Sequence, residues 1–358
     1  MDILPAELWK HEIHDFLPNP GLYDLDLALQ NIDINDPRTV VETMYRVFMK
    51  EDRTPMPPIM DDRDEWHAPR GPAIIWHHDD AATRSRAGNC ESVVVVSTHR
   101  GEITDPRFLA RLPKTVSVTL IMPWVTRIGH DCLMGCPRLQ SVSFVGMASL
   151  VGIGDYWMGA CPLLSTVAFD GLGVLEEVGD AWMWNCDGLV RTPGFGGLHS
   201  LRTVGKHWLQ DCVSLAEADF GGLYALRHVQ DGWMENCGSL ANTDFSGLRA
   251  LRAVGDSWMN GCSALTQLNF DGMMSLVEVG DYWLMDCALL VRPDFCGLVR
   301  LEQVGSGWMY RCSPHLDPCV EQLHTHIKSI GPGGRIDVLQ ALHNTADGRW
   351  ADSAMAFF

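Results

Sequence analysis

The sequence predicts an α/β solenoid in which units of about 25 residues stack on one another, each comprising a strand, a turn and a short helix. Three observations predict it: a cysteine, a tryptophan and a phenylalanine each recur at intervals of 25 or 26 residues. One unit has too little apolar surface to fold alone, so neighbouring units are expected to bury these side chains in a continuous core. The recurring residues are Cys136, Cys161, Cys186, Cys212, Cys237, Cys262, Cys287 and Cys312; Trp157, Trp182, Trp208, Trp233, Trp258, Trp283 and Trp308; and Phe144, Phe169, Phe195, Phe220, Phe245, Phe270 and Phe295.

The stretch between the leucine and the phenylalanine of each unit is predicted to be a strand. In the first full unit, Leu139, Val142 and Phe144 are apolar and the residues on either side of Val142 are polar. Such alternation is typical of a strand with one buried face. The unit that begins at Cys186 has 26 residues, and we expect its extra residue to form a bulge within residues 190–195.

The segment from the tryptophan to the cysteine is predicted to be the short helix. The two residues are four positions apart, the spacing that places side chains on one face of a helical turn. A glycine precedes this segment, in most units followed by an aspartate, and the two are expected to form and cap a turn. Gln230 takes the place of the glycine in one unit. The glycines are Gly154, Gly179, Gly205, Gly255, Gly280 and Gly305.

Charge and hydropathy exclude several classes of partner. Lys and Arg number 27 against 45 Asp and Glu, a formal net charge of −18, which argues against binding to nucleic acid. No apolar run approaches the roughly 18 residues that a membrane span requires. Asp2 and Glu7 stand where a secretory signal would be basic and then apolar, so we expect a cytoplasmic protein.

The cysteine and tryptophan ladders are interpreted as core, not as reactive or ligand-binding groups. Equivalent side chains in neighbouring coils lie about 4.7–4.9 Å apart, farther than the roughly 3.5–4.5 Å between the Cβ atoms of a disulfide, so reduced thiols are favoured over disulfides. No C-x-x-C pair indicates zinc, and no cofactor is expected. The tryptophans could stack nucleobases or form an aromatic cage, but their place before a buried cysteine favours core packing on the convex side. No phosphate loop, G-x-S-x-G motif or cysteine with a histidine partner is found, so the chain is not expected to be an enzyme.

These repeats resemble the BspA-like class of leucine-rich repeats, whose unit runs C-x-x-L-x-x-I-x-L and then I-G-x-x-A-F-x-x-C. Here Val-Gly-Asp-x-Trp-Met-x-x-Cys stands in place of the second motif, and Thr126–Cys132 is the closest single copy. This chain departs from the family in having Trp for a small residue and a unit about two residues longer. The resemblance covers about 200 residues, and it implies a leucine-rich repeat solenoid that binds proteins and has no catalytic activity.

The outward positions of the predicted strands form a polar, mostly acidic stripe. Like charges held close together in neighbouring coils favour a basic protein surface or peptide, although the stripe could also be an ordinary solvated strand face. Its members are Ser141, Ser143, Thr166, Asp170, Glu217, Asp219, Asn242, Asp244, Gln267, Asn269, Asp271, Arg292 and Asp294.

A second stripe is basic. Arg202, Arg227 and Arg252 occupy the same place in three consecutive units of the form L-R-x-V. We interpret this arginine ladder as a docking surface for an acidic partner segment; the alternative is a solvated face neutralised by Asp231 and Asp256.

The two ends of the chain do not repeat. We expect a helical and strand module at 1–112, with strands at 73–76 and 93–96, the solenoid at 113–319, and a helical cap at 320–358. Residues 3–30 begin Ile-Leu-Pro-Ala-Glu-Leu-Trp and resemble the opening of an F-box, which implies binding of a Skp-type adaptor through Leu4, Leu8 and Ile13; the alternative is a helix that caps the solenoid. We therefore expect a protein-interaction scaffold. An F-box-type substrate receptor of a ubiquitin ligase and a surface adhesin are the alternatives.

Overall fold

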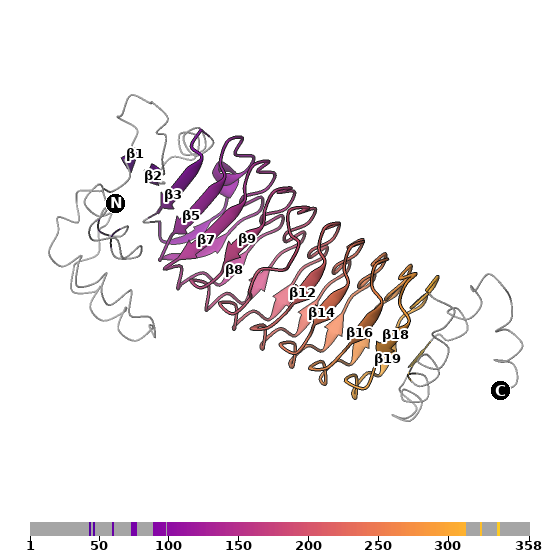
Figure 1. The fold of residues 1–358 in the computed structure, drawn as a ribbon. Coiled ribbons are helices and arrows are strands. Elements are labelled where there is room, and N and C mark those ends of the chain that lie inside the picture. Colours follow the sequence, from indigo (N-terminus) through magenta and orange to yellow (C-terminus); the bar gives the residue numbers. More distant parts are fainter. Residues whose placement is uncertain are drawn as a thin grey trace, which may run out of the picture.

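The computed structural model describes residues 43, 46, 59–60, 73–76, 89–97, 99–312, 323 and 335–336. Over 99–312 the chain is a parallel β-solenoid whose coils stack one after another along a single axis, which confirms the predicted solenoid of stacked units of about 25 residues (Figure 1). The F-box-like residues 3–30, with Leu4, Leu8 and Ile13, and nearly all of the predicted cap at 320–358 lie outside the described residues.

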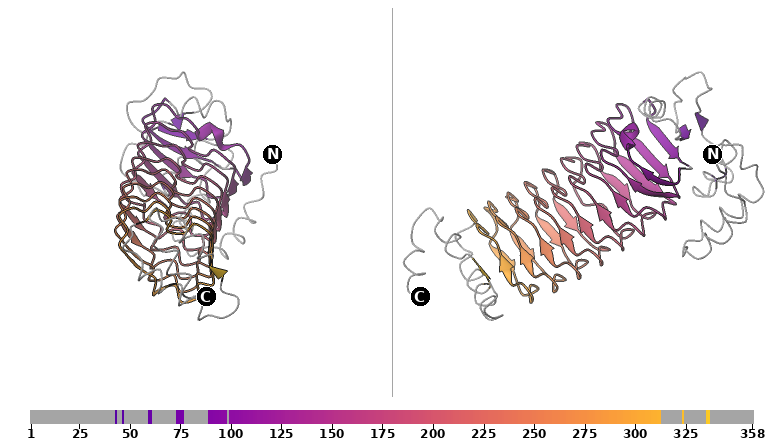
Figure 2. Two further views of the ribbon diagram at one scale, coloured as in Figure 1. Left: turned by 90° about the vertical axis from the view of Figure 1, so that its right-hand side faces the viewer. Right: turned by 180° about the vertical axis from the view of Figure 1, so that it is seen from behind.

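Two ladders of parallel strands run the length of the solenoid, as the two views of Figure 2 show. Sheet A begins with β1 (Ile59–Met60), which was not predicted, β2 (Ala73–Trp76), β3 (Ser92–Val96) and β5 (Ser117–Ile121). The predicted leucine-to-phenylalanine strands follow: β7 (Ser141–Val145) and β9 (Thr166–Ala168), continued by the pairs β12 (Glu217–Asp219) with β14 (Asn242–Asp244) and β16 (Gln267–Asn269) with β18 (Arg292–Asp294). Sheet B contains β4 (Gly101–Ile103), β6 (Val125–Ile128), β8 (Gly152–Ile153), β10 (Glu177–Val178), β11 (Thr203–Val204), β13 (His228–Val229), β15 (Ala253–Val254), β17 (Glu278–Val279), β19 (Gln303–Val304) and β20 (Arg335–Ile336). A short 3-10 helix, η1 (Pro106–Leu109), lies between β4 and β5.

The strands of sheet A follow the prediction, but in place of the bulge expected within residues 190–195 the strand itself is lost. β2 and β3 are the strands expected at 73–76 and 93–96, and β3 and β4 pair with β5 and β6, so both ladders already run through residues 92–103. In the 26-residue unit the strand is reduced to a single bridge between Arg191 and Glu217. The Thr192 hydroxyl there bonds both the amide and the carbonyl of Asp219, at 2.9 and 3.1 Å, in place of a backbone pair.

Sheet B was not predicted from the sequence. Its strands are the L-x-x-V-G segments, each only two to four residues long, with the valine or isoleucine buried and the preceding residue turned outward in most coils. Such short strands carry too little alternation to be recognised in one unit, so the signal lies only in the repetition of the valine.

The core consists of the predicted ladders. The tryptophans are at most 1% exposed and stack face to face on one another; Trp182 and Trp208, for example, have ring centroids 5.1 Å apart and planes 4° apart. The phenylalanines form a parallel stack that meets the tryptophans edge to face. Burial of aromatic rings in these geometries is strongly stabilising, so the core-packing interpretation of the tryptophans is confirmed.

The short helix predicted between tryptophan and cysteine is wrong. The residues one, three and five positions before each ladder cysteine have positive φ, as at Tyr156 (59°), Met158 (53°) and Ala160 (53°), which a right-handed helix excludes. Alternate amides bond to other coils instead: Tyr156 N–H donates to the Asp180 carbonyl at 2.6 Å and Met158 N–H to the Cys132 carbonyl at 2.9 Å. Tryptophan and cysteine share the inward side because every second residue of this zigzag points the same way, not because of helical spacing.

The ladder cysteines are free, as expected, and join neighbouring coils. The Cys237 thiol donates to the Leu209 carbonyl of the preceding coil at 3.1 Å, and Cys186, Cys212, Cys262 and Cys287 make the same bond at 3.2–3.3 Å. Burial raises the pKa of the Cys186 and Cys262 thiols to about 12, which keeps them protonated and unreactive.

A glycine and an aspartate follow several strands of sheet B and form a third link between coils. The Asp256 carboxylate accepts the backbone N–H of Asp281, in the next coil, at 2.8 Å, and Asp155, Asp180, Asp231 and Asp281 do the same for their neighbours. The following glycine is required because a Cβ at Gly255 would lie 2.7 Å from the backbone nitrogen of Asp231. Gln230 replaces the glycine in the one unit whose preceding coil has Lys206 in place of the aspartate.

Candidate interaction surfaces

The structure gathers the acidic stripe on the outward face of sheet A. Glu217 pairs with Asn242 and Asp219 with Asp244 across β12 and β14, and Gln267 and Asn269 of β16 pair with Arg292 and Asp294 of β18. The described side chains of this group are exposed, apart from a half-buried Glu217. Asp170 and Asp271 lie just beyond the strands and are exposed; Thr166 is exposed and Ser141 and Ser143 are half-buried.

Most carboxylates of this stripe already have partners within the chain. Asp219, Asp244 and Asp294 each accept the backbone N–H two residues ahead, at 2.7, 2.8 and 2.9 Å, so they terminate their strands. The Cys296 amide accordingly holds the pKa of Asp294 below its usual value. Glu217 forms an ion pair with Arg191 at 3.1 Å, and these engaged groups are poor anchors for a basic partner.

The arginine ladder lies at the entry to three neighbouring strands of sheet B. Arg252 N–H donates to the Arg227 carbonyl and Arg227 N–H to the Arg202 carbonyl, both at 2.8 Å, so the three residues stand side by side in successive coils. All three side chains are exposed.

The ladder is not neutralised by Asp231 and Asp256. The Asp231 carboxylate binds the Lys206 ammonium at 2.7 Å, and Asp256 accepts the Asp281 amide. Arg202 alone has an acidic neighbour, Glu176, at 3.5 Å. Among the residues that the structure describes, neither Arg227 nor Arg252 forms an ion pair or side-chain hydrogen bond.

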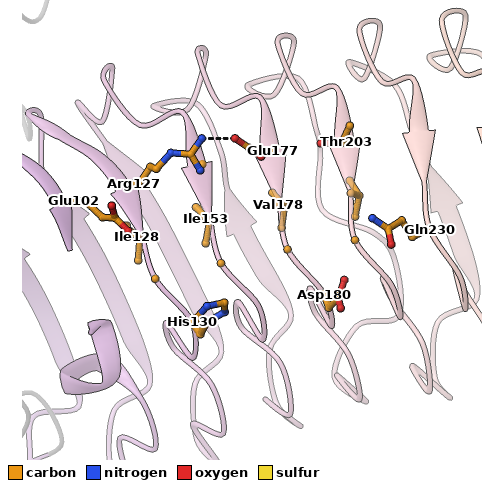
Figure 3. Close-up of a pocket in the computed structure, with 16 residues that line it drawn as sticks. Glu102, Arg127, Ile128, His130, Ile153, Glu177, Val178, Asp180, Thr203 and Gln230 are labelled. Carbon is orange, nitrogen blue, oxygen red and sulfur yellow. Dashed lines mark hydrogen bonds and ion pairs between the residues drawn. The ribbon is translucent and has the colours of Figure 1, made fainter. Parts of the chain in front are cut away.

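A shallow polar groove of about 380 Å³ lies over sheet B on the N-terminal side of the ladder (Figure 3). Within it, Arg127 reaches past the coil of Gly152 to form an ion pair with Glu177. A Cβ at Gly152 would lie 2.8 Å from the Arg127 guanidinium, so the glycine makes room for this bridge. Thr203 and Gln230 line its C-terminal end, beside the arginine ladder.

The sequence analysis missed a polar network at the corner opposite the arginines. The Asp211 carboxylate accepts the Trp184 indole N–H at 3.1 Å and the Asn236 amide at 2.9 Å. Glu235 accepts the side-chain amides of Gln210 and Asn260 in the same way, at 2.7 and 3.1 Å. Each carboxylate thus joins the coil before it to the coil after it. The available signal was the recurrence of amide and acidic residues one and two positions before the cysteines.

Chemistry-bearing clusters are sparse in this part of the chain. Among the described residues, no three histidine, cysteine or acidic side chains are placed to hold a metal ion. No helix of the described segments has the length and hydropathy to cross a bilayer.

Comparison with known proteins returns solved leucine-rich repeat structures. A leucine-rich repeat protein of T. pallidum is 21% identical, with 48% of this chain and 77% of that chain aligned and a TM-score of 0.38. A leucine-rich repeat protein from Bacteroides ovatus is 14% identical over 57% and 78% of the two chains (TM-score 0.20), and a leucine-rich cell surface protein from Faecalibacterium prausnitzii is 13% identical over 54% and 82% (TM-score 0.19). No protein-family model and no curated protein sequence matches the chain.

Proposed function

We propose that the protein is a non-enzymatic, cytoplasmic interaction scaffold that binds a protein partner through the outward face of sheet B, at the arginine ladder and centred on its members Arg227 and Arg252. The observation that carries the proposal is the pair of exposed guanidinium groups on Arg227 and Arg252, which have no ion-pair partner among the described residues of a chain of net charge −18. A chain with 45 acidic residues has ample means of pairing two arginines, so their isolation favours an acidic group supplied from outside.

Sheet B is a better recognition surface than sheet A for two reasons. Its backbone is a continuous ladder from β4 to β20, whereas sheet A is interrupted at the 26-residue unit and again between β14 and β16. The polar groups of sheet A are also largely committed: Asp219, Asp244 and Asp294 terminate strands and Glu217 is paired with Arg191. Parallel coils that present side chains at fixed intervals are the usual means by which solenoids form extended binding surfaces.

The experiment compares partners captured by the full-length chain with those captured by a variant in which Arg202, Arg227 and Arg252 are replaced by Ala. We expect at least one partner to be lost from this variant. A second variant, with Lys114, Arg138 and Arg191 replaced by Ala, removes the same charge from exposed positions outside sheet B and should retain that partner.

Mass spectrometry after chemical cross-linking in the native cells identifies the partners. An identical partner list from both variants would reject sheet B as the recognition surface. A third variant that lacks residues 1–50 separates this proposal from the F-box alternative, because loss of a Skp-type adaptor and a cullin on truncation would make the chain a ligase receptor. Cell fractionation tests the cytoplasmic location against that of a surface adhesin.

A further inference from the structure

We propose that Arg227 and Arg252 form a clamp for one phosphomonoester group, carried by a phosphoserine or phosphothreonine in an extended segment of the protein partner. The inference rests on the proposed function and specifies the chemical group that the arginine ladder recognises.

The backbones of the two arginines are held at a fixed spacing. Their backbones are joined by the 2.8 Å hydrogen bond from Arg252 N–H to the Arg227 carbonyl, and the strands that follow, β13 and β15, pair in register. Neighbouring strands lie about 4.8 Å apart. The two arginine side chains leave the backbone at this separation and have the same length, so one phosphate can bridge their guanidinium groups. Each guanidinium presents a planar fork of N–H donors, which suits bidentate contact with phosphate oxygens.

Four other basic side chains in or beside the two sheets have acidic partners. Arg127 pairs with Glu177, Arg191 with Glu217, Arg202 with Glu176 and Lys206 with Asp231. In each of these pairs the acid lies one or two coils away, so pairing between coils is a common device of this solenoid. Arg227 and Arg252 depart from it, side by side in adjacent coils.

The sequence around the clamp contains no acidic residue in three consecutive coils. Asp and Glu are absent from the segments that form this corner of those coils, 199–204, 224–229 and 249–254. The equivalent segments on either side, 173–178 and 274–279, contain acidic residues. Each of the three arginines is preceded, three residues earlier, by an exposed side chain that can donate a hydrogen bond or carry positive charge. These residues are His199, Tyr224 and Arg249. Ala225 and Ala250 lie between these side chains and the arginines in the sequence and Ala253 follows Arg252, so the exposed guanidinium groups have small neighbours.

The charge of the ligand follows from the repulsion between the two guanidinium groups. Two cations held about one strand spacing apart repel each other, and a carboxylate with a single charge offsets only one of them. A phosphomonoester carries about −1.5 to −2 charges at neutral pH and three acceptor oxygens, so it can satisfy both forks at once. The polar groove over sheet B adjoins the ladder at Thr203, and an extended polypeptide with its phosphate on the clamp has a polar path along it. The net charge of −18 disfavours a nucleic acid, whose many phosphates would meet acidic residues on both sides of the patch.

The test measures fluorescence anisotropy of labelled, degenerate peptide pools that share one fixed central residue, titrated with the full-length chain at low salt. The pools carry phosphoserine, serine or glutamate at that position. We expect the phosphoserine pool to bind about tenfold tighter than either other pool, because a tenfold change in Kd corresponds to the free energy of one good charge-assisted hydrogen bond. Arg227→Ala and Arg252→Ala should each remove most of that difference.

Arg202→Ala is the matched control, because its guanidinium already faces Glu176 and it stands in the same ladder. We expect it to weaken phosphopeptide binding by less than about twofold, since surface ion pairs are worth little. Arg227→Lys keeps the charge but not the fork, and it should bind with intermediate strength. All three positions are exposed, so thermal unfolding should be unchanged in the four variants and loss of binding cannot come from misfolding.

Equal binding of the phosphoserine and serine pools overturns the clamp, as does an equal loss for Arg202→Ala and Arg227→Ala. Vesicles that contain phosphatidylinositol phosphates and single-stranded DNA are titrated in parallel, and tighter binding to either, lost in Arg227→Ala, overturns the assignment to a protein segment. Failure of the clamp is distinguishable from failure of the proposed function. If the triple arginine variant loses its protein partner while no phosphopeptide binds, the scaffold stands and the clamp is wrong.

Discussion

The substitutions Ala160→Gly and Gly135→Ala should have opposite effects on stability, although the two residues occupy equivalent places in neighbouring coils. Both lie one position before a ladder cysteine and both have left-handed backbone, with φ of 53° at Ala160 and 63° at Gly135. A residue with a Cβ pays roughly 1–2 kcal/mol in this region, and glycine does not. Ala160→Gly should therefore stabilise the protein and Gly135→Ala should destabilise it.

The expected size is about 1 kcal/mol in each direction. A glycine gives the unfolded chain more freedom, which costs about 0.4–1 kcal/mol and offsets part of the gain from the relieved backbone. Sterics add little at Gly135, because a new Cβ would meet only the Arg111 side chain, at 3.4 Å. The difference between the two variants is thus dominated by φ.

Urea unfolding of the full-length chain, followed by tryptophan fluorescence, measures both effects. With a slope of about 3 kcal/mol per M, a change of 1 kcal/mol shifts the midpoint by about 0.3 M. Ala250→Gly is the control at a half-buried position without positive φ, and it should lower the midpoint. If Ala160→Gly lowers the midpoint as much as Ala250→Gly does, the zigzag backbone with alternating φ is refuted.

Three further predictions concern the core, the aspartate ladder and the exposed thiol. Trp258→Ala should lower the free energy of unfolding by about 3–5 kcal/mol because it opens a cavity in the stack. Trp258→Phe should cost much less, because it keeps a ring and removes an indole N–H that has no acceptor. Partial burial raises the pKa of Asp231, but the Lys206 ammonium and a backbone amide outweigh it and hold the pKa below its usual value. The stability from this group is therefore present above the unfolded pKa of about 3.9 and lost as pH falls through the folded pKa; Lys206→Ala should raise that pKa in an NMR titration. Cys296 is exposed, and its hydrogen bond with Asp294 raises the thiol pKa, so Asp294→Asn should speed its reaction with a disulfide reagent at pH 8.

Each of these predictions has a result that contradicts it. If Trp258→Phe destabilises the protein as much as Trp258→Ala does, a phenyl ring at this position does not restore any of the stability that the stacked indole provides. An Asp231 titration that is unchanged by loss of the ammonium would place the cause of its low pKa elsewhere. For the thiol, Cys296→Ser identifies the reactive group, because it should abolish the fast phase that Asp294→Asn accelerates.

Repetition made the fold predictable from the sequence, but the backbone conformation of the segment between tryptophan and cysteine was not predicted. Seven units that repeat leucine, phenylalanine, tryptophan and cysteine fix which residues face inward, because only stacking can bury them all. The spacing of four between Trp157 and Cys161 fits a helical turn and also a zigzag in which every second residue points inward. The composition of the position before the cysteine separates the two. It is Gly, Asn or Asp in six of eight units, the residue types that tolerate left-handed backbone.

The candidate site was only partly predictable, because a ladder of charges in the sequence does not reveal which of them are paired. The sequence identified Arg202, Arg227 and Arg252 as one column and offered Asp231 and Asp256 as neutralising groups only in the alternative interpretation. Both aspartates instead accept amides of the next coil. Pairing between coils joins residues 25 to 50 positions apart, and its geometry depends on how far neighbouring coils are offset, which no single unit specifies.

The contrast between the two stripes follows from how a solenoid uses its polar groups. Every coil must satisfy backbone amides at its corners, and in this chain carboxylates perform that task, from Asp155 to Asp281 beside sheet B and at Asp219, Asp244 and Asp294 beside sheet A. An acidic column that recurs in many coils is therefore explained by folding alone. A guanidinium group has no acceptor to offer a backbone amide, so the same explanation does not extend to the column at Arg227 and Arg252. That column is confined to three coils, and neither Arg227 nor Arg252 forms an ion pair or a side-chain hydrogen bond with the described residues, so its proposed role in recognition does not compete with a role in the stack.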